Sequence, residues 1–370
     1  MVYKKEDYIE DFNEGWCPGC GNFGIREACL RAFENLQLDP NKTVVVSGIG
    51  CSGKGALYYK VFVAHTLHGR TLPVAIGLKL ANPELNVIVH SGDGDCYGIG
   101  VEHFVSTGRY NPDITLVVFD NSVYALTKGQ ASPTLKRGEK LKSLPAPNIK
   151  DAINPIGIAL LSGYNYIAQG YAFNIEHLSN LIAGAIKHKG LSLVNVKQPC
   201  ITYDDIHTKD FYQNALFYIN NILILTKDLD KPIKVGIVKR EFSNHKIGEL
   251  VIIENEEQEK NCYVMEFKKA NEAVILPKEK AEELLKKECA RKIKEEDFYD
   301  EYIAFSIAKL MLNIPIIGKI YERKESKTYE ERIAYNIESY FAYPPAKQII
   351  CDEEGNPTTD IRKILDSFIV

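Results

Sequence analysis

The residues best suited to chemistry in this sequence are acidic and amide side chains that follow apolar runs. Gly92-Asp93-Gly94-Asp95 follows one run, and Asp120-Asn121 ends the next, 25 residues beyond Asp95. Magnesium prefers oxygen ligands and commonly takes one or two from the protein, with phosphate and water completing its octahedron. Glycines 92 and 94 let the backbone approach phosphate oxygens, and a helix expected to start near Val101 adds its positive end. The spacing predicts a magnesium and diphosphate site with Asp93 and Asn121 as ligands.

A second group of reactive residues is the turn Cys17-Pro-Gly-Cys20. A Pro-Gly pair favours a tight turn, which aims two thiolates at one centre. The chain has nine cysteines, but in a reducing cytosol they are not expected to form a disulfide framework. Cys29 falls on an apolar helical face with Ile25, Ala28 and Phe33, so we expect it in the core. The Cys17 turn is therefore the metal or redox candidate.

These residues need a scaffold, and the first two thirds of the chain predict a parallel α/β sheet. Apolar runs that end in polar, Gly or Cys residues occupy 43–50, 86–95, 114–121 and 191–200. Open α/β sheets bind ligands at the carboxyl ends of their strands, where the loops form a crevice. Between strands, residues 174–190 have helical apolar spacing, with Asn174 as the expected cap. The chemistry is thus expected at one edge of the sheet.

The composition changes after about residue 225. Short strand-like runs and a Lys/Glu-rich helix that Pro277 could start occupy the next stretch, which we interpret as a small α+β insertion. The expected organisation is an α/β domain over 1–225, the insertion over 226–297, and a C-terminal tail over 298–370.

Bulk properties exclude several classes of function. With 370 residues, 45% of them hydrophobic, the chain can bury a large core. A net charge of -4 and a pI near 6.1 give no broad basic field for nucleic acid or anionic membrane. No run approaches the ~20 apolar residues that span a bilayer, and the start lacks a secretory apolar segment. The expected location is the cytoplasm.

Residues 90–134, HSGDGDCYGIGVEHFVSTGRYNPDITLVVFDNSVYALTKGQASPT, resemble throughout the β subunit of 2-oxoacid:ferredoxin oxidoreductases. The Gly-Asp-Gly pattern followed by Asn is similar to the thiamine-diphosphate motif. The resemblance implies a thiamine-diphosphate-binding fold, with a mainly parallel sheet and helices on both faces. It implies magnesium ligands at Asp93, Asn121 and the backbone of Val123. The positions that it implies for cofactor binding are Ile49, Gly50, Cys51, Ser52, His68, Gly92, Asp93, Gly94, Asp95, Asn121, Val123, Tyr124, Ala125, Leu126 and Thr127.

The same family carries a four-cysteine iron–sulfur site. WCPGCGNFG at 16–24, GIGCSGK at 48–54 and KQPCITY at 197–203 match it, which implies a [4Fe–4S] cluster on Cys17, Cys20, Cys51 and Cys200. Four cysteines suit zinc equally well by ligand count, so a structural zinc site or buried free thiols remain alternatives. Cys96, Cys262, Cys289 and Cys351 have no matched partner and are expected to be structural.

The resemblance implies oxidative decarboxylation of a 2-oxoacid with coenzyme A, with electrons passing through the cluster to ferredoxin. Lys54 and Leu126 match positions that contact the 2-oxoacid, whether pyruvate, 2-oxoglutarate or another. The glutamate that activates thiamine lies on the partner subunit in this family, so an αβ or (αβ)₂ assembly is expected. The resemblance covers 10–215 and resumes weakly at 314–332. The alternatives are a non-redox thiamine decarboxylase or synthase, and a non-catalytic iron–sulfur or zinc subunit.

Overall fold

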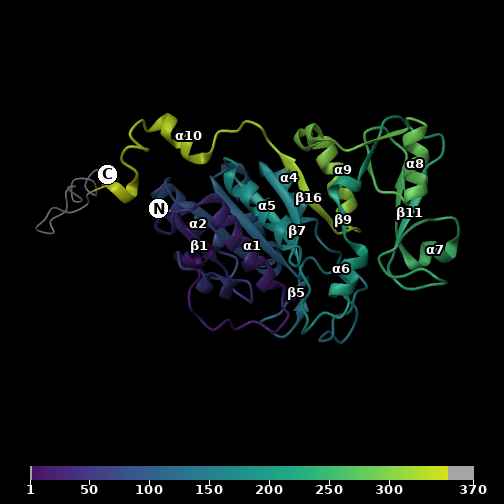
Figure 1. Cartoon of the computed structure of the whole chain (residues 1–370), viewed down its shortest axis with the longest axis horizontal. Coiled ribbons are helices and arrows are strands. Elements are labelled where there is room, and N and C mark those ends of the chain that lie inside the picture. Colours follow the sequence, from purple (N-terminus) through teal and green to yellow (C-terminus); the bar gives the residue numbers. More distant parts are fainter. Residues whose placement is uncertain (1, 349–370) are drawn as a thin grey trace, which may run out of the picture.

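The computed structural model describes residues 2–348. Within that range the chain builds one large sheet of eight strands, six of them parallel (Figure 1). Its strands run in the order β2 (Phe62–His65), β1 (Thr43–Ser47), β3 (Asn86–Gly92), β4 (Ile114–Asp120), β8 (Ser192–Lys197), β7 (Tyr166–Tyr171), β16 (Ile316–Glu322) and β9 (Phe217–Tyr218). The four strands predicted from apolar runs are β1, β3, β4 and β8, and all four are confirmed.

The central strands are apolar on both sides because helices cover both faces of the sheet. All seven residues of β4 are buried. Along β1, Val44 and Val46 belong to one apolar cluster and Val45 to another, as alternation across a sheet requires. One face carries α1 (Gly21–Leu36) and α5 (Ile175–Lys187), which pack together, and the other carries α2 (Thr71–Ala81), α3 (Val101–Tyr110) and α4 (Pro155–Ser162).

The predicted helix after Asn174 is present as α5, but the predicted cap is wrong. Asn174 makes no side-chain hydrogen bond to the start of α5. Its Nδ2 instead donates to the Tyr218 hydroxyl over 2.8 Å, because β9 brings that ring alongside. The apolar face of α1 is confirmed, since Ile25, Ala28 and Phe33 are all fully buried.

A small lobe lies beside the β16 end of the main sheet (Figure 1). It contains two antiparallel sheets and two helices: β14 (Ala273–Val274), β10 (Leu223–Leu225) and β15 (Ala290–Lys292); β12 (Leu250–Ile252), β11 (Ile233–Val238) and β13 (Cys262–Phe267); α7 (Glu256–Asn261) and α8 (Lys278–Lys286). The helix predicted at Pro277 is confirmed as α8. The lobe includes the expected insertion 226–297.

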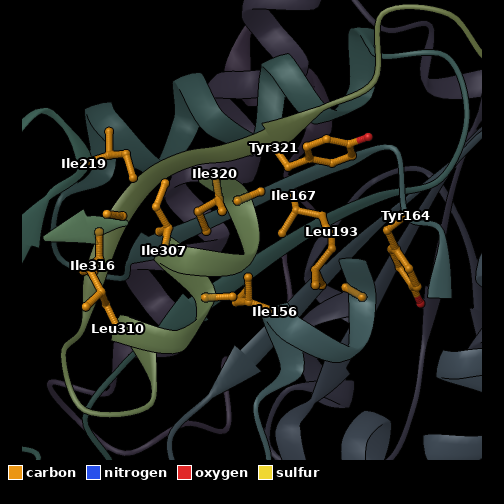
Figure 2. Close-up of a cluster of buried hydrophobic side chains, with 14 of the residues drawn as sticks. Ile156, Tyr164, Ile167, Leu193, Ile219, Ile307, Leu310, Ile316, Ile320 and Tyr321 are labelled. Carbon is orange, nitrogen blue, oxygen red and sulfur yellow. The ribbon is translucent and has the colours of Figure 1, made fainter. Parts of the chain in front are cut away.

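The lobe and the main sheet share one apolar core. Helix α9 (Glu301–Met311) follows the lobe and packs on α4, and its Ile307 and Leu310 meet Ile316 of β16 and Ile156 of α4 (Figure 2). The same cluster continues to Leu284 of α8. The lobe therefore packs on the main sheet through buried apolar contacts and is not joined to it by a linker alone.

The segment expected to form a tail is a strand of the main sheet, which corrects that expectation. Residues 316–322 form β16, antiparallel to β7. The following segment, with α10 (Tyr329–Asn336), returns to α2 and α3 (Figure 1). There the Tyr329 ring stacks on Tyr110, and the Tyr340 hydroxyl donates to the Leu80 carbonyl. In residues 2–348 no helix is long and apolar enough to cross a membrane. Cys351 lies outside the described residues.

Candidate cofactor and metal site

A cavity opens at the carboxyl ends of β1, β3 and β4. These strand ends meet at one edge because the strands are parallel. Every position predicted to bind the cofactor lines the cavity. The lining residues are Ile49, Gly50, Cys51, Ser52, His68, Gly92, Asp93, Gly94, Asp95, Phe119, Asn121, Val123, Tyr124, Ala125, Leu126, Thr127 and Gln198.

Asp93 lies buried at the inner end of the cavity beside a second buried carboxylate, Asp120. Ser132 Oγ donates to Asp93 Oδ2 over 2.5 Å, and Thr134 Oγ1 lies 2.8 Å from that oxygen and 2.7 Å from Asp120 Oδ1. Burial raises the pKa of Asp93, and the Asp120 charge raises it further. Burial opposes ionisation of Asp120 too, but the Lys197 ammonium 2.5 Å away lowers its pKa. Of the two carboxylates, Asp93 is thus the one without a cation, and it faces the cavity.

Asn121 and the short loop after it form the opposite wall. The Val123 N–H donates to Asn121 Oδ1 over 3.0 Å, and β5 (Val123–Tyr124) pairs with β6 (Gln130–Ala131) to hold the loop. The Tyr124 hydroxyl donates to the Gly94 carbonyl over 3.2 Å. A Cβ at Gly94 would lie 2.3 Å from Tyr124 Cε1, so glycine is needed here for Tyr124 to pack.

Asp95 organises loops below the cavity floor. Its Oδ1 accepts from the Gly69 N–H over 2.7 Å and lies 2.5 Å from His68 Nδ1, while Oδ2 accepts from Ser91 Oγ over 2.5 Å. Both oxygens are therefore used by the chain itself, and Asp95 acts through His68, which lines the cavity. The helix predicted to start near Val101 is confirmed as α3, and a π-helical turn over Gly94–Ile99 precedes it.

Sequence reasoning missed four residues of this site. Gln198 and Phe119 line the cavity, and Ser132 and Thr134 contact Asp93. Gln198 could have been predicted, because it stands at the polar end of the expected strand run 191–200. It is 1% exposed, and its Oε1 has no hydrogen-bond partner among the described residues.

Of the two residues predicted to contact the substrate, Leu126 lines the cavity and Lys54 does not. Leu126 is half exposed at the cavity rim, beside Thr127. Lys54 is not among the lining residues of the described cavity, because its Nζ donates to the Gly15 carbonyl over 3.3 Å. That contact places Lys54 under the Cys17 loop, where its charge lowers the pKa of the Cys51 thiol against the larger, opposite effect of burial.

The four matched cysteines lie on three loops that hydrogen bonds fasten together. Thr202 Oγ1 donates to Cys17 Sγ over 3.2 Å, which joins the loop of Cys200 to that of Cys17. Trp16 Nε1 donates to the Cys51 carbonyl over 2.7 Å, which joins the third loop. Burial and, to a smaller extent, the thiols of Cys200, Cys51 and Cys17 raise the pKa of Cys20 to about 12, against a lowering by the Asn22 N–H. The four thiols therefore share one electrostatic environment.

The thiols do not converge on one point. Among the described residues, no three His, Cys, Asp or Glu side chains group closely enough to hold a metal ion. Asn22, next to these thiols at the start of α1, is 1% exposed, and both polar atoms of its amide are without partners in the described part of the chain. Cys29 and Cys96 are buried in apolar clusters elsewhere, as expected.

Residues 48–196 match the family described as the thiamine pyrophosphate enzyme, C-terminal TPP binding domain. The chain is 44% identical over 352 residues to the 2-oxoacid:ferredoxin oxidoreductase subunit beta of Saccharolobus solfataricus, covering 95% of both chains. It is 42% identical over 359 residues to subunit beta of the corresponding enzyme 1 of Aeropyrum pernix, covering 96% of this chain and 93% of the relative.

A solved structure is also similar over the whole chain. It is a 2-oxoglutarate:ferredoxin oxidoreductase from Magnetococcus marinus with 2-oxoglutarate, coenzyme A and succinyl-CoA bound, at a TM-score of 0.70 and 26% identity, covering 100% of this chain and 97% of that one. The matches to the archaeal relatives run through residues 226–297, since they cover 95% or more of this chain. The insertion is therefore shared with these two relatives, whereas the match to the 2-oxoglutarate synthase subunit KorB of Archaeoglobus fulgidus covers 61% of this chain.

Proposed function

The chain belongs to the β-subunit family of the 2-oxoacid:ferredoxin oxidoreductases, and on this premise we propose that it carries the thiamine-diphosphate site of such an enzyme. With an α subunit it would oxidise a 2-oxoacid to an acyl-CoA and CO₂ and pass electrons through a [4Fe–4S] cluster to ferredoxin. The observation that carries the proposal is the cavity at three parallel strand ends, which both Asp93 and Asn121 line.

The cavity fits thiamine diphosphate and magnesium on two counts. Asp93 is a buried carboxylate that lacks a cation, and a magnesium ion bound to a diphosphate needs only one or two protein ligands. The Gln198 carbonyl is a buried acceptor without a donor, which the polar groups of a cofactor would supply. Asn121 and the Val123 backbone would complete the magnesium site. When bound, thiamine supplies the carbon nucleophile that lets a 2-oxoacid lose CO₂ and release electrons singly.

We infer a cluster and not a zinc ion at the four cysteines, because a redox centre beside a thiamine site can accept the electrons that the oxidation releases. The unpartnered Asn22 amide would donate to a cluster sulfur, the kind of contact that tunes a potential.

Substrate selection would fall to the cavity rim. Leu126 would shape the pocket, and Lys54 would meet the substrate carboxylate after its Nζ leaves the Gly15 carbonyl. The α subunit would supply the glutamate that activates thiamine, so activity is expected only from the assembly. Residues 1–225 would hold both cofactors, with 226–297 and 298–370 as separate supporting regions. The net charge favours neither nucleic acid nor a membrane as a partner. The location that we propose for the enzyme is the cytoplasm.

The test is anaerobic analysis of the chain purified with its α subunit, reporting iron, sulfide, zinc and thiamine diphosphate per heterodimer. We expect about four iron, four sulfide and one thiamine diphosphate, and CoA-dependent reduction of ferredoxin by pyruvate or 2-oxoglutarate. Cys51→Ala should remove the iron and leave thiamine binding. Thiamine without iron would indicate a non-redox decarboxylase or synthase, and iron or zinc without thiamine would indicate a non-catalytic subunit.

A further inference from the structure

One exposed loop, residues 137–150, packs directly on the Cys200 loop. Leu141 is fully buried in an apolar cluster that includes Cys200 and Tyr203. The Lys142 N–H donates to the Tyr203 carbonyl over 3.1 Å. The loop is thus a neighbour of the proposed cluster, although it contributes no ligand to it.

The loop turns two lysines outward. The side chains along the loop alternate in exposure: Glu139 and Leu141 face inward, and Lys140 and Lys142 are exposed. In the part of the chain that the structure describes, neither lysine forms an ion pair, whereas nearby Arg137 pairs with Asp151. Glu139, the acidic residue that precedes Lys140 in the chain, is neutralised from inside, since its Oε1 lies 3.5 Å from His207 Nε2. The outer face of the loop therefore carries two uncompensated positive charges.

The protein surface next to this loop exposes one of the four thiols, that of Cys17. Cys17 and Thr202 are exposed, and Ile201 between the Cys200 and Thr202 positions is 42% exposed. An apolar contact and a thiolate at the surface, bordered by lysines, match what an electron carrier with an acidic surface needs: charge steers it in, and a short path leads to the redox centre. A partner docking elsewhere would meet a longer path through the fold.

We propose that Lys140 and Lys142 form the docking surface for the electron acceptor, a small one-electron carrier with an acidic face. The proposal rests on the function proposed above, because it needs a reduced cluster behind Cys17 and Cys200. In each encounter one electron passes from the reduced cluster to the carrier, so two carriers are reduced for each 2-oxoacid oxidised. The buried Glu139 and His207 keep the loop in a fixed position relative to Cys200.

The test compares Lys140→Glu/Lys142→Glu with Lys278→Glu/Lys286→Glu in the purified αβ complex. The control pair lies on α8, is exposed, and changes the net charge equally. Binding of an oxidised acidic [4Fe–4S] ferredoxin is measured by titration calorimetry from low to high salt. We expect the first variant to bind at least ~10-fold more weakly at low salt, with the difference shrinking as salt rises, and the control to match the wild type.

Turnover separates this inference from the proposed function. Reduction of methyl viologen, a small cationic acceptor, should stay at the wild-type rate in the Lys140→Glu/Lys142→Glu variant while the KM for ferredoxin rises. Unchanged ferredoxin affinity would overturn the docking surface. So would a raised KM for coenzyme A with both acceptors, or loss of the α subunit on purification, since the lysines would then serve the coenzyme or the subunit contact. A wild-type complex that reduces neither acceptor would instead refute the proposed function.

Discussion

Among single residues, Asp93 is the most consequential, because two carboxylates are buried together and, within residues 2–348, only Asp120 has a cation beside it. Lys197 and Asn195 satisfy Asp120, and Ser132 and Thr134 give Asp93 hydrogen bonds but no charge. Such an arrangement is costly without a bound cation and favourable with one. The residue is therefore adapted to a ligand more than to the stability of the free chain.

Asp93→Asn should lower the affinity for magnesium thiamine diphosphate by about 100-fold or more, since a ligand charge is lost and even second-layer changes cost 10–100-fold. The free protein should be no less stable than the wild type, because a buried charge is removed. Cofactor titration followed by thermal unfolding measures both effects. Iron content serves as the control, and normal cofactor affinity in the variant would contradict the assignment.

His207 is predicted to stabilise the loops around Cys200. Its Nδ1 lies 2.7 Å from Asp204 Oδ2, and Asp204 accepts from the His207 N–H as well. Burial opposes its charge, but Glu139 and Asp204 raise the pKa of His207 to about 10, while His207 lowers the pKa of Glu139 to about 2 against the effect of burial. His207→Gln removes the cation beside the buried Asp204 and leaves Lys136 as the cation near Glu139, and it should cost about 3–5 kcal/mol of unfolding free energy.

The pH dependence of this loss of unfolding free energy follows from the raised pKa of His207 and the lowered pKa of Glu139. The contribution of His207 is complete below its ordinary pKa of 6.5 and is lost as pH rises through about 10. That of Glu139 is complete above 4.5 and is lost as pH falls through about 2. The difference between wild type and variant should be largest between pH 4.5 and 6.5. His177→Gln is the control: burial lowers the pKa of His177, so its effect should stay constant above neutral pH.

For the helices and strands, close packing at one glycine sets where α1 lies. A Cβ at Gly24 would lie 2.0 Å from the Ala172 carbonyl oxygen, a backbone atom that follows β7. Gly24→Ala should therefore push α1 from the sheet and cost about 1–3 kcal/mol or more. Gly77→Ala in α2 meets nothing within 4 Å and should gain up to about 1 kcal/mol from helix propensity. Urea unfolding of both variants checks this, and shifts of the same sign would refute it.

What could be predicted from the sequence depended on whether a signal was local. Asp93 and Asn121 stand at the ends of continuous apolar runs, so their approach followed from the geometry of parallel strands. β7 escaped notice because Gln169 and Gly170 interrupt its apolar pattern. Ser132 and Thr134 reach Asp93 only through tertiary folding, and no spacing in the sequence marks them. The strand β16 within the expected tail was not predicted, because a strand's own sequence does not indicate which strand it pairs with.

At the scale of the whole molecule, the shared core predicts one cooperative unit. Leu284 of the small lobe belongs to the same buried cluster as Val46 of the main sheet. Leu284→Ala should cost about 2–5 kcal/mol and should lower the midpoint seen by Trp16, the only tryptophan, as much as that seen by circular dichroism. If the midpoint seen by Trp16 stayed unchanged while the midpoint seen by circular dichroism fell, the lobe would be shown to unfold by itself.

The pairing of β7 with β16 has a consequence for biosynthesis. β7 ends at Tyr171 and its antiparallel neighbour begins at Ile316, so 144 residues of nascent chain lie between them. At ~5–20 residues per second, the ribosome leaves one edge of β7 uncovered for roughly 7–30 s. An unpaired apolar strand edge is a template for wrong association. Until translation delivers β16, this edge is where nascent-chain chaperones are needed most.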